Sequence, residues 1–240
     1  MTISVVTQIY LMSVVILSTE VLVLFFTILD FLKLDFLKRF RISYDNKERD
    51  YPSNSEIVHA LKVSYSSVLR IYCLPMLLSY VFDIGMPFVN KSEPAQEVGE
   101  VIGELMLITI MGDITLYLIH RLFHTPWLFK NYHIKHHRDY TYTFAAIHHF
   151  FDDFEGIVLA LAGIFPVIIF HVHFYSYLAW LAIVQLSAII GHSGYQIPGM
   201  SETFPIMNPR YHDGHHKFVG ANYGAIFTWT DRMFGTLRLK

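Results

Sequence analysis

The chain has 240 residues, of which 53% are hydrophobic and 16% aromatic, and its mean hydropathy is +0.39. This composition excludes an ordinary soluble globular protein and indicates a membrane protein. The net charge of −2 leaves no general basic surface for nucleic acid, and the single cysteine excludes an internal disulfide framework.

Five apolar stretches predict membrane-spanning helices, because each is long enough to cross about 30 Å of hydrocarbon. They cover residues 8–32, 63–82, 101–119, 154–173 and 176–193. The second is the weakest, since it contains Arg70 and Pro75, and we expect it to be tilted or kinked. Glu20 lies inside the first stretch, so it should face other helices, either as a tolerated carboxylate or as a functional group.

Basic residues are distributed unevenly along the chain. Residues 33–62 carry seven of them, whereas residues 83–100 carry only Lys91. The region around the histidine-rich stretch and the carboxyl terminus is also basic, and residues 139–209 contain no lysine or arginine. The positive-inside rule therefore predicts that the histidine side is cytoplasmic and that the amino terminus is on the other side.

Histidines recur at helical spacing from residue 120 onward. His120 and His124 are four residues apart, and the H-x-x-H-H pattern occurs twice, at 133–137 and 212–216. Among 14 histidines in 240 residues, two copies are expected by chance in roughly one chain in a thousand. Imidazoles on one helix face can bind the same metal ion. A structural zinc site usually has four ligands and recruits cysteine. The number of motif histidines exceeds four, which favours two metal ions.

Two residues near these motifs extend the candidate site. His192 ends the second helix of the 154–193 hairpin, which brings it back to the level of the other histidines. Asp113 precedes His120 by seven residues on the same helical face. We expect its carboxylate to accept the second ring N–H of a ligating histidine, although pairing of membrane helices is an alternative role.

The motifs HRLFH, HIKHH, GHSGYQIP and HDGHHKFVGANYGAIFTWTDRMFGT resemble those of the fatty acid hydroxylase and sterol desaturase superfamily. Within it they resemble the C-4 methylsterol oxidases, which share the HSGY and FTWxDRxFGT sequence motifs. The resemblance covers about residues 105–237. It implies an all-α integral membrane helical bundle with a cytoplasmic helical cap that carries a dimetal centre. Residues 1–100 would be N-terminal membrane helices and residues 101–240 the catalytic domain.

The resemblance also implies a non-haem di-iron centre that uses O₂ to hydroxylate a sterol, at the C-4 methyl group, in the endoplasmic reticulum membrane. Electrons would come from NAD(P)H through a reductase and cytochrome b5. Asp113, Gln196 and Asn222 are catalytic candidates, and Gln196 would either leave a coordination position open or supply a weak oxygen ligand. The implied metal ligands are His120, His124, His133, His136, His137, His192, His212, His215 and His216.

Some readings stay open. The family has a His-Pro-Leu-Glu-like segment where this chain reads AAIHHFFDDFEG, so His148 and His149 are either functional or merely packed. A fatty acyl or sphingolipid hydroxylase would use the same nine histidines. A histidine-rich metal transporter is a distant alternative, because it should place histidines along a path through the bilayer rather than at one level.

Overall fold

The computed structural model describes residues 4–42, 51–84, 98–138, 142–196 and 208–238. Most of the loop at 83–100 lies outside these ranges. Within them every regular element is a helix, which confirms the all-α prediction.

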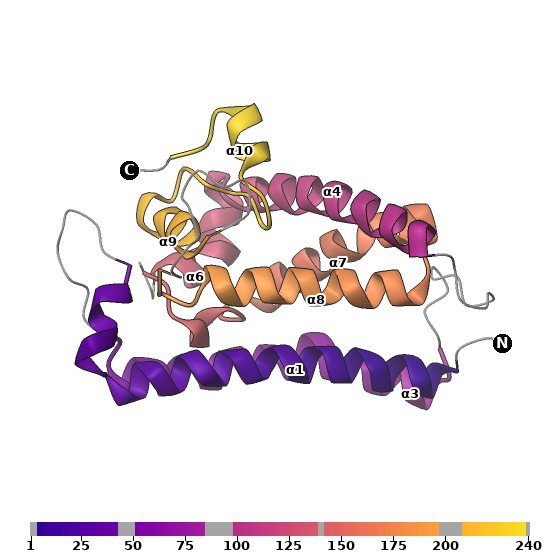
Figure 1. The fold of residues 1–240 in the computed structure, drawn as a ribbon, viewed down its shortest axis with the longest axis horizontal. Coiled ribbons are helices and arrows are strands. Elements are labelled where there is room, and N and C mark those ends of the chain that lie inside the picture. The colour runs from indigo at the N-terminus through magenta and orange to yellow at the C-terminus, as the bar shows by residue number, and fades with distance from the viewer. Residues whose placement is uncertain (1–3, 43–50, 85–97, 139–141, 197–207, 239–240) are drawn as a thin grey trace.

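Four long helices form the body of the molecule and run along its long axis (Figure 1). They are α1 (Val5–Leu32), α4 (Val98–Phe123), α7 (Asp153–Phe170) and α8 (Phe174–Gly191). All four are long and apolar enough to cross a membrane. They correspond to four of the five predicted spans.

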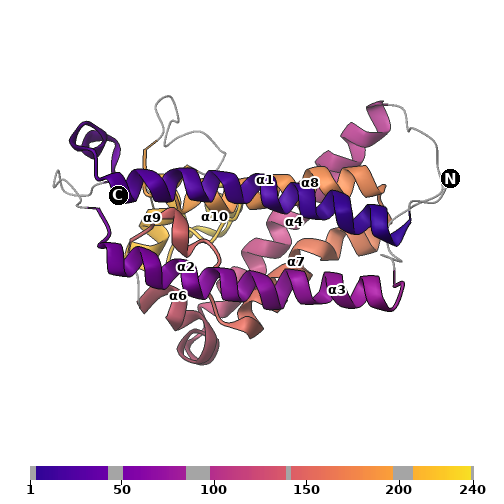
Figure 2. The same ribbon diagram turned by 90° about the horizontal axis from the view of Figure 1, so that it is seen from below.

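The remaining predicted span, 63–82, is divided among three shorter helical pieces. It falls on α2 (Asn54–Val68), the π-helical turn η2 (Leu69–Cys73) and α3 (Leu74–Val81). Pro75 has no N–H to donate, and the ladder widens just before it, where the Leu74 N–H donates to Leu69 O. None of the three pieces has 18 residues, so a crossing here stays a prediction, although the run lies beside α1 (Figure 2).

Helix α1 buries Gln8 and both of its carboxylates beside several apolar residues, and it exposes many large apolar side chains. Leu17 and Val21 are each 65% exposed, whereas Gln8 and Glu20 are 2% and 7% exposed. Water would oppose such exposure, but lipid solvates leucine and valine well and carboxylates poorly. Glu20 therefore faces the other helices, as the sequence predicted.

Six of the shorter elements gather at one end of the bundle, and we call them the cap. Figure 1 shows α6, α9 and α10 there together with the carboxyl terminus, while the amino terminus lies at the other end. The cap comprises α5 (Pro126–Leu128), η3 (Phe129–His133), α6 (Ile134–Arg138), η4 (Ala145–Ile147), α9 (Pro209–Phe218) and α10 (Trp229–Phe234).

A buried ion pair joins the end of α1 to the segment that follows η1. After the 3₁₀ turn η1 (Asp35–Phe40), Arg41 Nη1 donates to Asp30 Oδ1 at 2.8 Å, and both side chains are at most 1% exposed. The Tyr195 hydroxyl donates to the same oxygen at 2.8 Å. A second donor from outside α1 thus ties the segment after His192 to this helix.

The contact between α4 and α8 yields a stability prediction. A methyl group at Gly112 would lie 2.2 Å from the ring of Trp180, and this indole is held by its bond to Gly163 O at 2.8 Å. We expect Gly112→Ala to destabilise the protein by about 1–3 kcal/mol through overpacking. Thermal unfolding in detergent measures the effect.

The matched control is Gly103→Ala on the same helix, where a methyl group would meet nothing within 4 Å. Its unfolding temperature should stay the same or rise slightly, because alanine favours helix more than glycine does. Equal losses for both variants would show that the contact with Trp180 is not tight.

Candidate metal centre

Four segments bring histidines into the cap. Helix α4 ends with His120 in its last turn and His124 just beyond it. The π-turn η3 and helix α6 supply the 133–137 motif, and α9 supplies the 212–216 motif. His192 is the C-cap residue of α8. All nine predicted ligands therefore lie at one end of the bundle.

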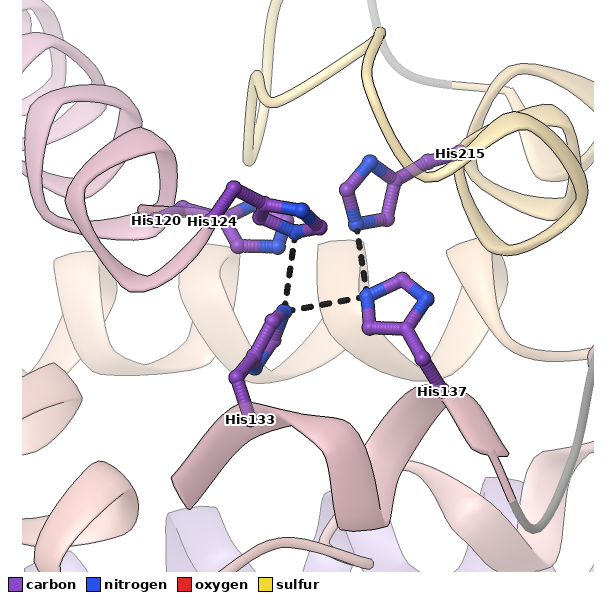
Figure 3. Close-up of side chains that lie close together, drawn as sticks. All are labelled: His120, His124, His133, His137 and His215. Atoms are coloured by element: carbon purple, nitrogen blue, oxygen red, sulfur yellow. Dashed lines mark hydrogen bonds between the residues drawn. The ribbon is translucent and has the colours of Figure 1, made fainter. Parts of the chain in front are cut away.

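The first group contains five rings whose ligand atoms all lie within 4.8 Å of one another: His120, His124, His133, His137 and His215. Figure 3 shows them pointing toward one another from three segments. The Nε2 atom of His133 lies 3.0 Å from that of His124 and 3.0 Å from that of His137. The Nε2 atom of His215 lies 3.1 Å from that of His137.

The second group contains four rings under the same 4.8 Å limit: His136, His192, His212 and His216. The Nε2 atom of His192 lies 2.9 Å from that of His212 and 3.4 Å from that of His136. The two groups are neighbours, since the rings of His137 and His216 are 4.8 Å apart. The structure thus brings together every histidine that the motifs singled out and divides them into two sets.

In four of these histidines the other ring nitrogen, Nδ1, is hydrogen-bonded to a backbone carbonyl oxygen. A carbonyl oxygen can only accept, so each of these Nδ1 atoms carries the proton, and Nε2 of the neutral ring is left with a lone pair. The pairs are His120 with Tyr223 O (2.9 Å), His136 with Phe150 O (2.9 Å), His192 with Ala188 O (2.7 Å) and His215 with Ala221 O (2.7 Å).

Burial disfavours the charged form of seven rings that lie outside the membrane helices. Burial lowers the pKa of His124 to about 2 and the pKa of His136 and His192 to about 3. Burial also holds the pKa of four more rings well below the usual value, those of His133, His137, His212 and His215.

Such converging lone pairs fit a bound cation. The Nε2 atoms of His136 and His192 face each other with both protons on the far side of the rings. Two lone pairs in this position repel, and a positive ion between them turns the repulsion into two bonds. Nitrogen ligands lie about 2.0–2.1 Å from a zinc-sized ion, so two ligands of one tetrahedral ion are separated by about 3.3 Å, close to the 3.4 Å between these two atoms.

The family model for fatty acid hydroxylase matches residues 105–236. The chain belongs to this family. The match covers the ends of α4 and α8 and the whole cap, so every histidine of the two groups lies inside it. The predicted family is confirmed.

Relatives of this fatty acid hydroxylase family member carry two kinds of name. Methylsterol monooxygenase 1-2 of Arabidopsis thaliana is 26% identical over 80% of this chain and 66% of its own length. Methylsterol monooxygenase 1-3 of the same plant is 28% identical over 72% of this chain and 62% of its own. Very-long-chain aldehyde decarbonylase GL1-10 of Oryza sativa is 26% identical over 72% and 60%. The chain thus spans slightly under two thirds of each relative, and no solved structure matches it.

A cavity of about 350 Å³ opens onto both histidine groups. His120 and His133 of the first group line it, as do His136, His192 and His212 of the second. The rest of its wall is mostly apolar and comes from α1, α3, α4, α7 and α8, as far as Gln8 and Ser79. Cap and membrane helices therefore share one cavity.

Glu155 is a site residue that sequence reasoning missed. Its Oε1 atom lies 2.7 Å from His133 Nδ1, and both side chains are 2% exposed. It lies in the first turn of α7, after the N-cap residue Asp152. A carboxylate here fixes which nitrogen of His133 carries the proton. Its spacing from His133 follows no helical period, so no local signal in the sequence reveals the pair.

The role predicted for Asp113 is wrong. Asp113 Oδ1 accepts the backbone N–H groups of Ile226 and Phe227 at 2.9 and 3.1 Å, and no histidine ring. The ring of His120 donates instead to Tyr223 O. Asp113 therefore holds the 226–227 segment, whose Ile226 lines the cavity, and acts on the shape of the site rather than on a ligand.

The other two catalytic candidates, Gln196 and Asn222, are not among the residues that line the cavity. Helix α8 ends at Gly191, and the backbone N–H of Gln196 donates to Phe40 O at 2.6 Å. An open coordination position in its place stays a prediction. Asn222 is fully buried with a φ of 60°. Its amide ties Tyr211 O to the Arg238 backbone, so its role is to hold the end of the chain.

The Glu155 contact predicts a defect in metal affinity. We expect Glu155→Gln to weaken metal binding by about 10- to 100-fold, because an amide orients the His133 ring less strongly than a carboxylate does. Competition with a chelator on the purified protein measures it. Glu104→Gln is the matched control, since Glu104 also faces a histidine, His173, but outside both groups. Equal affinities in the two variants would contradict the assigned role.

Proposed function

We propose that this protein is a membrane-bound, O₂-dependent non-haem di-iron oxidase that hydroxylates a sterol. The observation that carries the proposal is the pair of converging sets of histidine nitrogens, five and four in number. One tetrahedral ion needs only four ligands, and surplus buried lone pairs would be costly, so two ions account for the arrangement.

Two iron ions held by these nine histidines would supply the activation of O₂ that oxidation of an unactivated C–H bond requires. The protein's own contribution is positional. The backbone carbonyl oxygens and Glu155 keep the rings in the tautomer that binds metal. The cavity holds the lipid against both histidine groups and excludes water from the reacting carbon.

The cavity has a mostly apolar wall and lies among the membrane helices, and both features agree with a lipid substrate. Relatives named methylsterol monooxygenase favour a sterol, and we propose the C-4 methyl group as the oxidised position. The described parts of the chain contain no glycine-rich dinucleotide turn after a strand. Electrons would therefore arrive from NAD(P)H through a reductase and cytochrome b5 docked on the basic face of the cap.

An acyl-lipid hydroxylase is the second candidate, favoured by the relative named very-long-chain aldehyde decarbonylase. It would use the same nine histidines and differ only in what fills the cavity. Assays of the purified protein with methylsterols and with acyl lipids, under O₂ and a reducing system, separate the two. Oxidation of acyl lipids alone would overturn the sterol assignment and leave the oxidase assignment intact.

Metal content gives the sharpest prediction for the oxidase. His215→Ala should lower turnover by more than the ten- to hundredfold typical of groups that only orient a ligand, because it removes a nitrogen from the first group. Iron per chain and lipid oxidation are measured on the same sample. His59→Ala is the control, since His59 belongs to neither group. Full oxidation by the His215 variant would sink the di-iron assignment.

We also propose that the cap is cytoplasmic, in the endoplasmic reticulum membrane. In sealed microsomes a carboxyl-terminal tag should be digested by added protease and an amino-terminal tag should be protected. The reason is the concentration of basic residues at 33–62 and around the cap. A protected carboxyl-terminal tag would overturn this orientation.

A further inference from the structure

A third group of possible ligands lies outside the nine histidines. Glu20 from the middle of α1 meets His148 and His149, which follow the turn η4, and their ligand atoms all lie within 4.8 Å of one another. Glu20 Oε1 is 3.2 Å from His148 Nε2 and 3.7 Å from His149 Nε2. The exposed fractions of the three residues are 7%, 5% and 3%, so the group is removed from water.

The proton positions repeat those of the main centre. His148 Nδ1 donates to Ala145 O at 3.1 Å, so Nε2 of the neutral ring turns a lone pair toward the carboxylate of Glu20. Burial lowers the pKa of both His148 and His149, which disfavours an imidazolium. A lone pair facing a carboxylate oxygen is unfavourable unless a proton or a metal ion lies between them.

His149 is the second independent observation. Neither of its ring nitrogens has a hydrogen-bond partner among the described residues, although the side chain is buried. Burying a ring nitrogen without a hydrogen-bond partner is unfavourable, because the nitrogen loses its water. The Tyr72 and Phe151 rings contact it and supply no ligand atom. A hydrogen bond between Glu20 and His148 alone would leave this cost in place.

We propose that Glu20, His148 and His149 form a third metal site, which binds one divalent transition-metal ion such as zinc. Two imidazoles and one carboxylate are a known zinc ligand set that leaves a coordination position open. Ligand atoms about 2.0–2.1 Å from a tetrahedral ion are separated by about 3.3 Å, close to the 3.2 and 3.7 Å found.

The site faces the cavity. His148 and His149 line the same cavity as the ligands of the main centre. An ion with three protein ligands therefore has its open position on the cavity side, where an oxygen atom of the occupant can bind it. This proposal does not depend on the reaction proposed above, because it concerns residues of neither histidine group.

The test counts metal ions in the full chain purified in detergent and supplied with iron and zinc. Wild type should bind about three ions per chain, and Glu20→Gln and His149→Phe about two each. Phenylalanine keeps a flat ring beside Tyr72 and removes both nitrogens. The matched control is His59→Phe, which changes an exposed histidine outside all three groups and should leave about three.

No loss of an ion in either variant relative to wild type would overturn the third site. Where one of the two variants does not fold, the other is compared with wild type by stripping both with chelator and titrating them with Co²⁺. An absorbance endpoint one equivalent lower in the variant than in wild type supports the site, and equal endpoints overturn it. If the main centre holds one ion rather than two, the difference of one between wild type and His149→Phe still reports the third site, so failure of the proposed function is told apart from failure of this inference.

Discussion

Lone pairs of neutral imidazoles that point at one another across about 3 Å are the constraint on which the cap depends. Nothing in the rings themselves favours this arrangement, because burial strips them of water and keeps them uncharged. The surrounding protein must impose it, and cations bound between the rings would compensate it. The cap is therefore built from buried polar anchors rather than from apolar packing alone.

Asp231 shows how these anchors act at a distance. Its carboxylate accepts the N–H groups of Tyr223 and Gly224 at 2.9 and 2.7 Å, the Thr236 hydroxyl at 2.6 Å, and the Tyr211 hydroxyl. The carbonyl of Tyr223, fixed in this way, accepts the proton of His120. Asp231, in the carboxyl-terminal sequence motif of the family, thus orients the ligand His120 from 111 residues away without contacting the metal site.

The ligand histidines could be predicted from the sequence, whereas the groups that orient their rings could not. Histidine spacing singled out eight of the nine rings, because ligands on helices follow a local period. His192 followed from the hairpin that it ends, and the full set of nine from the resemblance to the family. Glu155 and the carbonyl oxygens follow no such period, and their positions depend on how α7 and the loops pack. The prediction for Asp113 failed for the same reason: helical spacing placed it on the correct face of α4, but the 226–227 segment from far along the chain occupies that face. The candidate Gln196 came from the resemblance rather than from spacing, and it lies beyond the end of α8 at Gly191 and off the cavity wall.

The histidines of each H-x-x-H-H motif are divided between the two groups, and spacing alone could not predict this division. Residues three and four positions along a helix differ by about 100° in direction, so neighbouring histidines diverge. His133 and His137 join the first group while His136 joins the second. In α9 the assignment is reversed: His212 and His216 join the second group, and His215 joins the first.

Each motif therefore gives two rings to one group and a single ring to the other, and the two motifs complement each other. This crossing explains why the motif occurs twice. Without the copy in α9, the second group would keep only His136 and His192, which is fewer than the three protein ligands of a typical metal site. A transporter would gain nothing from such an exchange, since it needs sites in series along the membrane normal. Two adjacent sites that share two helices are suited instead to holding a pair of ions side by side at one end of a lipid cavity.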